Sequence, residues 1–261
     1  MNKIVLLVDF TGVCLLAMEH VAILSRESLC RVILLHIAPK DKAGDPKLVQ
    51  KEVRDFAAPL EKEGVPFAIH IEFGDFFELI SVELNKIDPD LLVVGTHGFK
   101  GIKQNFQSSN ILNLLHKIDT PSLIIQGHAL TPQEGYKSIL VPMIEADEVI
   151  DWMTPTASFA KVFKSDLTIL GFSTPEKKAL LLKKGEDAQA KFDEAGITNT
   201  LDIEDISKYI TAFSRSIIEY ADIEDCDLIV LILGRKQANY FDILDQENIL
   251  LNRLGKPILC L

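Results

Sequence analysis

Residues 88–94 read Asp-Pro-Asp-Leu-Leu-Val-Val, and residues 225–231 repeat them as Asp-Cys-Asp-Leu-Ile-Val-Leu, 137 positions later. Self-similarity at a nearly constant offset is typical of a duplicated structural unit. The chain is therefore predicted to hold two copies of one domain, 1–127 and 137–261, joined by a segment rich in turn-forming residues. Three other pairs of segments recur in the same order at offsets of 134, 138 and 136, namely 3–10 with 137–144, 110–112 with 248–250, and 120–125 with 256–261.

Short apolar runs alternate with amphipathic stretches in each copy. The runs are apolar on both faces, which is typical of parallel strands covered by helices on both sides. The predicted fold class is thus α/β, with two doubly wound five-stranded parallel-sheet domains in tandem. In the first copy the expected strands are 4–8, 32–37, 68–72, 91–94 and 123–125, and the expected helices are 13–24, 46–63, 76–87 and 109–118.

The composition excludes several classes of protein. The 261 residues are 48% hydrophobic and 25% charged, as in ordinary globular domains, and the formal charge is −11. No apolar run approaches the ~18 residues of a membrane-spanning helix, and an acidic chain lacks the clustered Lys and Arg that bind nucleic-acid phosphates. The four cysteines form no C-x-x-C pair, which favours buried free thiols in a reducing compartment. We therefore expect a cytoplasmic protein whose partners are neither nucleic acid nor membrane.

The expected ligand site lies beyond the carboxyl ends of the strands, where strand order reverses in open parallel sheets. Gly95 and Gly98 follow the fourth strand, and glycine permits the close backbone approach or positive φ that such a loop needs. Ser108 and Ser109 then open the next helix, where free backbone N–H groups suit an anion such as phosphate. Residues 91–118 hold three lysines and no acidic residue, in a chain with 38 Asp and Glu. This basic island predicts a phosphate-binding loop, and a plain strand–turn–helix connection with solvated lysines is the alternative.

The spacing Gly95-x2-Gly98-x9-Ser108-Ser109 resembles the universal stress protein signature, Gly-x2-Gly-x9-Gly-[Ser/Thr]. The opening Ile-Val-Leu-Leu-Val-Asp-Phe and the flanking Leu-Val-Val-Gly-Thr-His-Gly and Asp-Thr-Pro-Ser-Leu-Ile-Ile are similar to that family too. The resemblance covers the first copy well and the second only in its strands. It implies the adenine nucleotide alpha hydrolase-like fold and a tandem chain whose two domains form a pseudo-dimer, with association of whole chains as a homodimer left open. In family homodimers the last strands often pair, which here are 123–125 and 258–260.

The resemblance also implies which residues contact a nucleotide. Asp9 and Ile37 map to positions that meet the adenine and ribose in nucleotide-binding members, and the glycine loop with its serines maps to positions that meet ribose and phosphates. The implied ligand is ATP or another adenine nucleotide, with Mg²⁺ arriving on its phosphates. Ser108 departs from the family pattern, because it stands at the third glycine and its side chain occupies space that a phosphate needs. The predicted nucleotide-binding residues are Asp9, Ile37, Gly95, His97, Gly98, Ser108, Ser109 and Asn110.

The second copy departs further from the signature. The residue matched to the acid after the first strand is Met143, and the residue matched to the first loop glycine is Ile232. Asp245 and Glu247 stand near the position expected for phosphate, where carboxylates repel a triphosphate. We therefore expect no nucleotide in the second copy.

Three functional hypotheses follow. The first is a regulatory protein that binds one adenine nucleotide in the first copy and acts through ligand-dependent contact with protein partners. The second is an interaction scaffold in which both sites have decayed. The third is slow ATP hydrolysis with Mg²⁺ and a loop group such as His97. No enzyme motif is present, so we expect no catalytic residue, and no recognised ligand spacing predicts a metal site.

Asp9 and His36, which follow or end expected strands, also have structural interpretations. Asp9 is a candidate N-cap for the helix that begins near residue 12, since Asp is strongly preferred at that position. His36 is expected to be a strand-end residue whose ring nitrogens are satisfied by neighbours.

Overall fold

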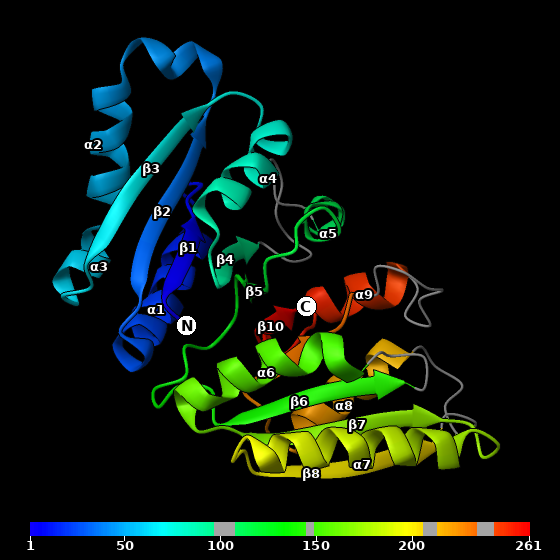
Figure 1. Ribbon diagram of the computed structural model, residues 1–261. Helices are drawn as coiled ribbons and strands as arrows, with labels where there is room; N and C mark the ends of the chain where they lie inside the picture. Colours follow the sequence, from blue (N-terminus) through cyan, green and yellow to red (C-terminus); the bar gives the residue numbers. More distant parts are fainter. Residues whose placement is uncertain (97–107, 145–148, 206–212, 234–242) are drawn as a thin grey trace. The chain divides into compact units, whose positions relative to one another are not determined.

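The protein divides into two compact units, Met1–Thr131 and Pro132–Leu261. The computed structural model describes residues 1–96, 108–144, 149–205, 213–233 and 243–261. Each unit is a parallel sheet with helices on both of its faces (Figure 1). The division falls after Thr131, inside the turn-rich segment 127–135 that the sequence analysis singled out.

Unit 1 has its strands in the order β3-β2-β1-β4-β5, all parallel. The chain winds outward from β1 to β3 and then returns to β4 on the far side of β1. Because such crossovers are right-handed, α1, α2 and α3 cover one face and α4 and α5 the other. In chain order the elements are β1 (Lys3–Leu7), α1 (Gly12–Ser28), β2 (Arg31–Ala38), the short 3-10 helix η1 (Lys40–Gly44), α2 (Pro46–Phe56), α3 (Ala58–Lys62), β3 (Phe67–Phe73), α4 (Phe76–Ile87), β4 (Leu91–Thr96), α5 (Ser108–Leu115) and β5 (Ser122–Gln126).

Unit 2 repeats this order of strands as β8-β7-β6-β9-β10, again all parallel. Within the described residues, each unit therefore has five strands, as predicted. The elements are β6 (Ser138–Ile144), α6 (Val149–Phe163), β7 (Asp166–Ser173), α7 (Lys178–Glu194), β8 (Asn199–Asp205), α8 (Phe213–Ile223), β9 (Leu228–Leu231), α9 (Ile243–Leu250) and β10 (Ile258–Cys260).

The expectation of one helix over 46–63 is wrong, because the structure has two helices there. α2 ends at Phe56 and α3 begins at Ala58, with Ala57 between them. Pro59 lies in the first turn of α3 and has no N–H, so it cannot donate the bond that would continue α2. Gly64, at φ +71°, ends the segment, as expected of glycine after a helix.

Both units hold their first strand in the same way. The Asp90 carboxylate accepts hydrogen bonds from the backbone N–H groups of Asn2 and Lys3, at 2.6 and 2.9 Å. The Asp227 carboxylate accepts from Lys137 and Ser138, at 2.7 and 3.0 Å. The repeated Asp-x-Asp segment is therefore a clamp that joins the start of β4 to β1, and the start of β9 to β6.

This clamp corrects the alignment of the two first strands. Lys3 pairs with Arg31 in the first sheet, and Ser138, not Lys137, pairs with the equivalent Asp166 in the second. The similarity of 3–10 to 137–144 is thus displaced by one residue from the structural equivalence. The two lysines also differ in role, since the Lys3 ammonium donates to the Ile87 carbonyl and the Lys137 ammonium donates to Phe163 O at 2.8 Å.

The cysteines are free and buried, as predicted. Burial raises the pKa of Cys14 to about 12 and raises that of Cys226 as well, so these thiols stay protonated and unreactive at neutral pH. Among the helices that the structure describes, none combines the length and apolar character that a membrane crossing requires.

Candidate functional site

The carboxyl ends of β1 and β4 lie side by side in unit 1, because the two strands are paired in the centre of the sheet. Strand order reverses here, since β2 follows β1 on one side while β4 returns on the other. Asp9 comes two residues after β1 ends, and Gly95 lies near the end of β4. These two predicted residues are therefore brought to the position at which open parallel sheets bind ligands.

Asp9 organises the entry to α1 but does not cap it. The N-cap is Thr11, whose hydroxyl accepts from the backbone N–H of Cys14 at 3.1 Å. The Oδ1 atom of Asp9 accepts from both the N–H and the hydroxyl of Thr11, at 3.0 and 2.7 Å. The N-cap interpretation of Asp9 is thus wrong by two residues, because Asp9 holds the capping side chain in place.

Phe10 is a residue that the sequence analysis did not single out. It adopts a left-handed backbone conformation with φ +60°, which is uncommon for an aromatic residue. Its ring is 37% exposed and packs edge-on against His36 and Phe56, at centroid distances of 4.7 and 5.3 Å. The turn after β1 therefore presents an aromatic ring at the strand end, and no periodicity in the sequence predicts this.

His36 has the structural role expected of it. Its Nδ1–H donates to the Val8 carbonyl at 2.8 Å, which ties the end of β2 to the end of β1. Burial lowers the pKa of the ring, so the histidine is held neutral. The strand-end position of His36 is confirmed, and its Nδ1 has the expected backbone partner. The next residue, Ile37, is half-buried near the end of the same strand.

Gly95 is required by packing whatever the loop binds. A Cβ at this position would lie 2.9 Å from both the carbonyl carbon and oxygen of Val13 and 3.1 Å from the nitrogen of Cys14. These are backbone atoms at the start of α1, and they cannot move aside as a flexible side chain can. Glycine here lets α1 pack directly on β4, so the first glycine of the signature has a structural reason of its own.

The remaining predicted residues are described only in part. His97 and Gly98 lie outside the described residues, and for Ser108, Ser109 and Asn110 the structure gives the backbone, which forms the start of α5. The structure thus brings together Asp9, Ile37 and Gly95 as residues of three adjoining strand ends.

The equivalent place in unit 2 has different chemistry. By the register of the sheet, the counterpart of Asp9 is Ile144, and Met143 corresponds to Val8. Asp245 is buried, and its carboxylate accepts from the N–H of Ser214 at 3.2 Å, at the start of α8. Its charge therefore serves a helix N-terminus, where a carboxylate is favourable.

Comparison with known proteins identifies a family model and solved structures that are similar to this chain. Residues 1–126 match the model of the Universal stress protein family. A universal stress protein from Archaeoglobus fulgidus DSM 4304 has a TM-score of 0.72 at 16% identity, over 99% of this chain and 97% of that one. A functionally unknown protein from Pseudomonas aeruginosa PAO1 has a TM-score of 0.68 at 14% identity, over 100% and 92%.

The cytoplasmic domain of a prokaryotic cation chloride cotransporter has a TM-score of 0.57 at 14% identity, over 99% of this chain and 94% of that one. At such identities the likeness is one of fold alone, and the same fold serves unrelated roles. No curated protein matches the sequence. The two units define a tandem α/β protein, with two five-stranded parallel sheets of the same strand order. The first unit, over residues 1–126, belongs to the universal stress protein family, and the second unit repeats its strand order.

Proposed function

We propose that this protein is a regulatory protein of the universal stress type that binds ATP or another adenine nucleotide in unit 1. The observation that carries the proposal is the position of Asp9 and Gly95 at the ends of the paired strands β1 and β4, at the point where strand order reverses. Asp9 offers a carboxylate for ribose hydroxyls, and the half-buried Ile37 offers apolar surface for a base.

Charge and helix geometry add support for a phosphate group. The basic island of residues 91–118 has three lysines and no acidic residue, in a chain of net charge −11. It includes the start of α5, and a helix start favours anions through its free N–H groups and its dipole. Mg²⁺ then accompanies the phosphates as part of the ligand.

Unit 2 is proposed to bind no nucleotide. Ile144 and Ile232 replace the carboxylate and the first loop glycine, by the registers of β6 and β9. Asp245 adds a buried negative charge beside the start of α8. One nucleotide per chain is therefore the expected stoichiometry.

The proposal is tested by isothermal titration of the full chain with Mg-ATP, after removal of any co-purified nucleotide. Asp9→Asn separates the charge of Asp9 from its structural role, because the amide oxygen can still accept hydrogen bonds from Thr11 while the negative charge is lost. Gly98→Val, in the loop, is expected to abolish binding. Gly95 variants are unsuitable for this test, because a side chain there strains the contact with α1.

The expected result is one site per chain, weakened in Asp9→Asn and lost in Gly98→Val, with the melting temperatures of both variants close to that of the wild type. Ser108→Gly is expected to tighten binding by restoring the third glycine of the signature. Two sites per chain would contradict the proposal for unit 2, and binding unchanged in Gly98→Val would contradict it for unit 1.

The second candidate function is an interaction scaffold without nucleotide. The observation that favours it is Ser108, which places a side chain where the family signature has glycine. Under this hypothesis neither heat nor a thermal shift accompanies ATP. Slow hydrolysis is a third outcome of the same experiment, and it predicts ADP in the titrated sample after hours with Mg²⁺.

A further inference from the structure

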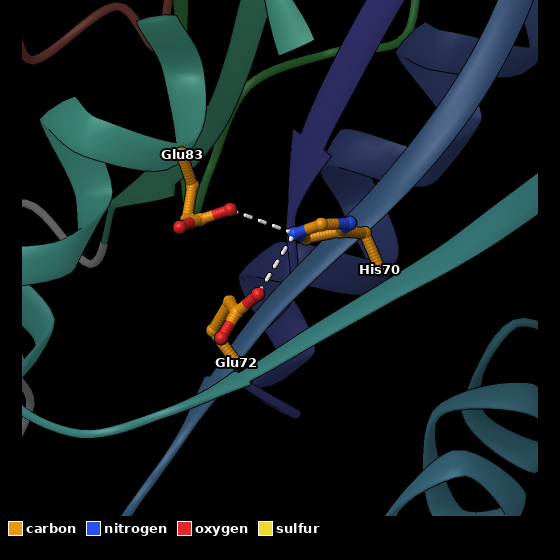
Figure 2. Close-up of side chains that lie close together, drawn as sticks. All are labelled: His70, Glu72 and Glu83. Atoms are coloured by element: carbon orange, nitrogen blue, oxygen red, sulfur yellow. Dashed lines mark hydrogen bonds and ion pairs between the residues drawn. The ribbon is translucent and has the colours of Figure 1, made fainter. Parts of the chain in front are cut away.

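Three side chains of unit 1 lie close together: His70, Glu72 and Glu83 (Figure 2). Nε2 of His70 lies 2.9 Å from Oε2 of Glu83 and 3.5 Å from Oε1 of Glu72. The three ligand atoms lie within 4.8 Å of one another. One imidazole nitrogen thus faces two carboxylates that the chain brings together from separate elements.

The fold positions these side chains firmly. His70 and Glu72 stand two residues apart on β3, so they project from the same face of the sheet. β3 pairs with β2 over seven residues, which fixes their register. Glu83 comes from the buried side of α4, between the core residues Ile80 and Leu84. The cluster therefore joins an edge strand of unit 1 to the helix that covers it.

Glu83 is the unusual member of the cluster, because a carboxylate that is only 1% exposed loses nearly all its water. Burial raises the pKa of Glu83, but the hydrogen bonds with Lys86 and His70 lower it by more. The net shift of the pKa is downward, so the carboxylate is charged. Lys86 binds Oε1 at 2.6 Å, whereas Oε2 faces His70. The oxygen directed at the cluster is thus separate from the one that carries the ion pair.

We propose that His70, Glu72 and Glu83 form a binding site for a divalent transition-metal ion such as Zn²⁺. In a tetrahedral zinc site, ligand atoms at about 2.0–2.2 Å from the ion are about 3.4 Å from each other. The two separations from Nε2, 2.9 and 3.5 Å, bracket that value. Imidazole nitrogen and carboxylate oxygen are both zinc ligands, and three protein ligands leave a fourth position for water.

The charges and the exposure of the cluster favour a cation over a closed ion-pair network. Two carboxylates face one lysine, which leaves an excess negative charge. A single N–H of His70 can point at only one of the two oxygens at a time, whereas a metal ion binds all three ligand atoms together. The side chains of His70 and Glu72 are 36% and 38% exposed, so an ion has access from solvent. Lys86 then stays on Oε1 as an outer partner of a ligating carboxylate.

Unit 2 provides an internal comparison. Leu35 of β2 is paired with His70 of β3, and the equivalent Leu170 of β7 is paired with Asp202 of β8. Asp202 is therefore the counterpart of His70. Counting back from the left-handed residues at 88 and 225, the counterpart of Glu83 is Tyr220. Tyr220 donates its hydroxyl hydrogen to Asp202 at 2.5 Å. This pair supplies no imidazole, so the proposed metal site has no counterpart at the equivalent junction of unit 2.

The test is titration of the chelator-stripped full chain with Zn²⁺ alone, followed by calorimetry and by the melting temperature. Glu72→Gln is the decisive variant, because Glu72 is at the solvent edge of the cluster and its loss leaves the Glu83–Lys86 pair intact. We expect one zinc ion per chain, a zinc-dependent rise in the melting temperature, and binding at least about tenfold weaker in Glu72→Gln. Without zinc, the two proteins should melt at the same temperature.

Glu204→Gln is the matched control, because Glu204 holds the position on β8 that Glu72 holds on β3. It should bind zinc as the wild type does, while His70→Gln should lose binding. Equal zinc affinity in the wild type, Glu72→Gln and His70→Gln would place the ion elsewhere and overturn the proposal. Absence of any zinc effect on the wild type would overturn it too, and would make the cluster a plain ion-pair network.

Discussion

The junction of strand and helix at residues 70 and 83 of unit 1 and its counterpart at 202 and 220 of unit 2 have the same backbone and different side chains. In unit 1 a buried carboxylate, Glu83, meets His70 and Lys86. In unit 2 an exposed Asp202 meets the hydroxyl of Tyr220. The clamps at Asp90 and Asp227, by contrast, are nearly identical. The two units therefore share the contacts that build the sheet and differ in the polar side chains at this junction.

The strand ends show the same division. Unit 1 has Asp9 and Gly95 at the switch point of its sheet, and unit 2 has Ile144 and Ile232. At the strand ends, the carboxylate and the loop glycine therefore belong to unit 1. The core of unit 2 packs the fully buried Trp152 against Phe192, at a centroid distance of 6.1 Å. The predictions below test how far the two units differ.

The largest effect is expected for Gly95→Val, which forces a branched side chain against the backbone of α1. We expect a loss of unfolding free energy of about 3 kcal/mol or more, at the upper end of overpacking substitutions. The matched control is Ile232→Val in unit 2, which removes one methylene from a half-buried side chain and should cost about 1 kcal/mol or less.

Urea unfolding followed by far-UV circular dichroism measures the effect on both units. Trp152 is the only tryptophan and lies in unit 2, so its fluorescence follows that unit separately. Gly95→Val should lower the circular dichroism midpoint more than the fluorescence midpoint. Equal costs for Gly95→Val and Ile232→Val would refute the packing argument for the glycine.

The second effect is a pH dependence that arises from the buried His20 of α1. Burial lowers its pKa from 6.5 to about 4, so the folded protein keeps the ring neutral while the unfolded chain takes up a proton. The stabilisation is complete above pH 6.5 and is lost as the pH falls toward 4, by roughly 3 kcal/mol at 1.36 kcal/mol per pKa unit. His36 shifts in the same direction and adds to the loss.

Urea midpoints between pH 7 and pH 4.5 measure this dependence. Glu83 and Asp90, whose pKa values are lowered, begin to lose their contributions only at the acid end of this range. His20→Gln cannot take up a proton and should flatten the curve. His116→Gln, at an exposed position, is the control and should leave it unchanged. A wild-type curve that is flat from pH 7 to 4.5 would contradict the prediction.

The third effect is the loss of unfolding free energy when either clamp is removed. Asp90→Ala and Asp227→Ala each remove an acceptor of two backbone N–H groups at the start of a first strand. Each should cost about 1–2 kcal/mol, since water can replace part of the lost bonding at the surface. The half-buried Asp227 should cost slightly more than the exposed Asp90. A cost confined to one of the two variants, in urea unfolding, would contradict the shared role.

These comparisons also show what the sequence could reveal. The buried runs at β1, β4 and β5 are apolar on both faces, so the parallel sheets and the repeat were predictable from local pattern. The sequence alignment of β1 with β6 was displaced by one residue, because it matched Lys3 with Lys137. These two lysines donate to different partners and are not structurally equivalent. The interruption at Ala57 escaped notice because an amphipathic pattern continues through it, although Pro59 was a visible signal.

The candidate sites were predictable only where a motif has local spacing. The glycine–serine loop has such spacing, whereas His70 and Glu83 are 13 positions apart on a strand and a helix whose contact exists only in the folded chain. The alternation of His70 and Glu72 on β3 was the one available signal, and it does not indicate a third ligand. Phe10 was missed for a different reason, since its left-handed turn depends on how Asp9 and Thr11 bond.

The smallest effect is expected for Tyr220→Phe. The Tyr220 hydroxyl donates to Asp202 at the surface, and burial together with that carboxylate raises its pKa, so the bond persists at any pH near neutrality. Its loss should cost less than about 1 kcal/mol, because water can solvate the exposed Asp202 instead.

Glu83→Gln, at the equivalent place in unit 1, should cost more, since it weakens the charged bonds to His70 and Lys86 in a buried setting. Urea unfolding of both variants without metal decides this order. Equal costs would mean that burial does not separate the two junctions, and that the difference between the units lies in ligand chemistry alone.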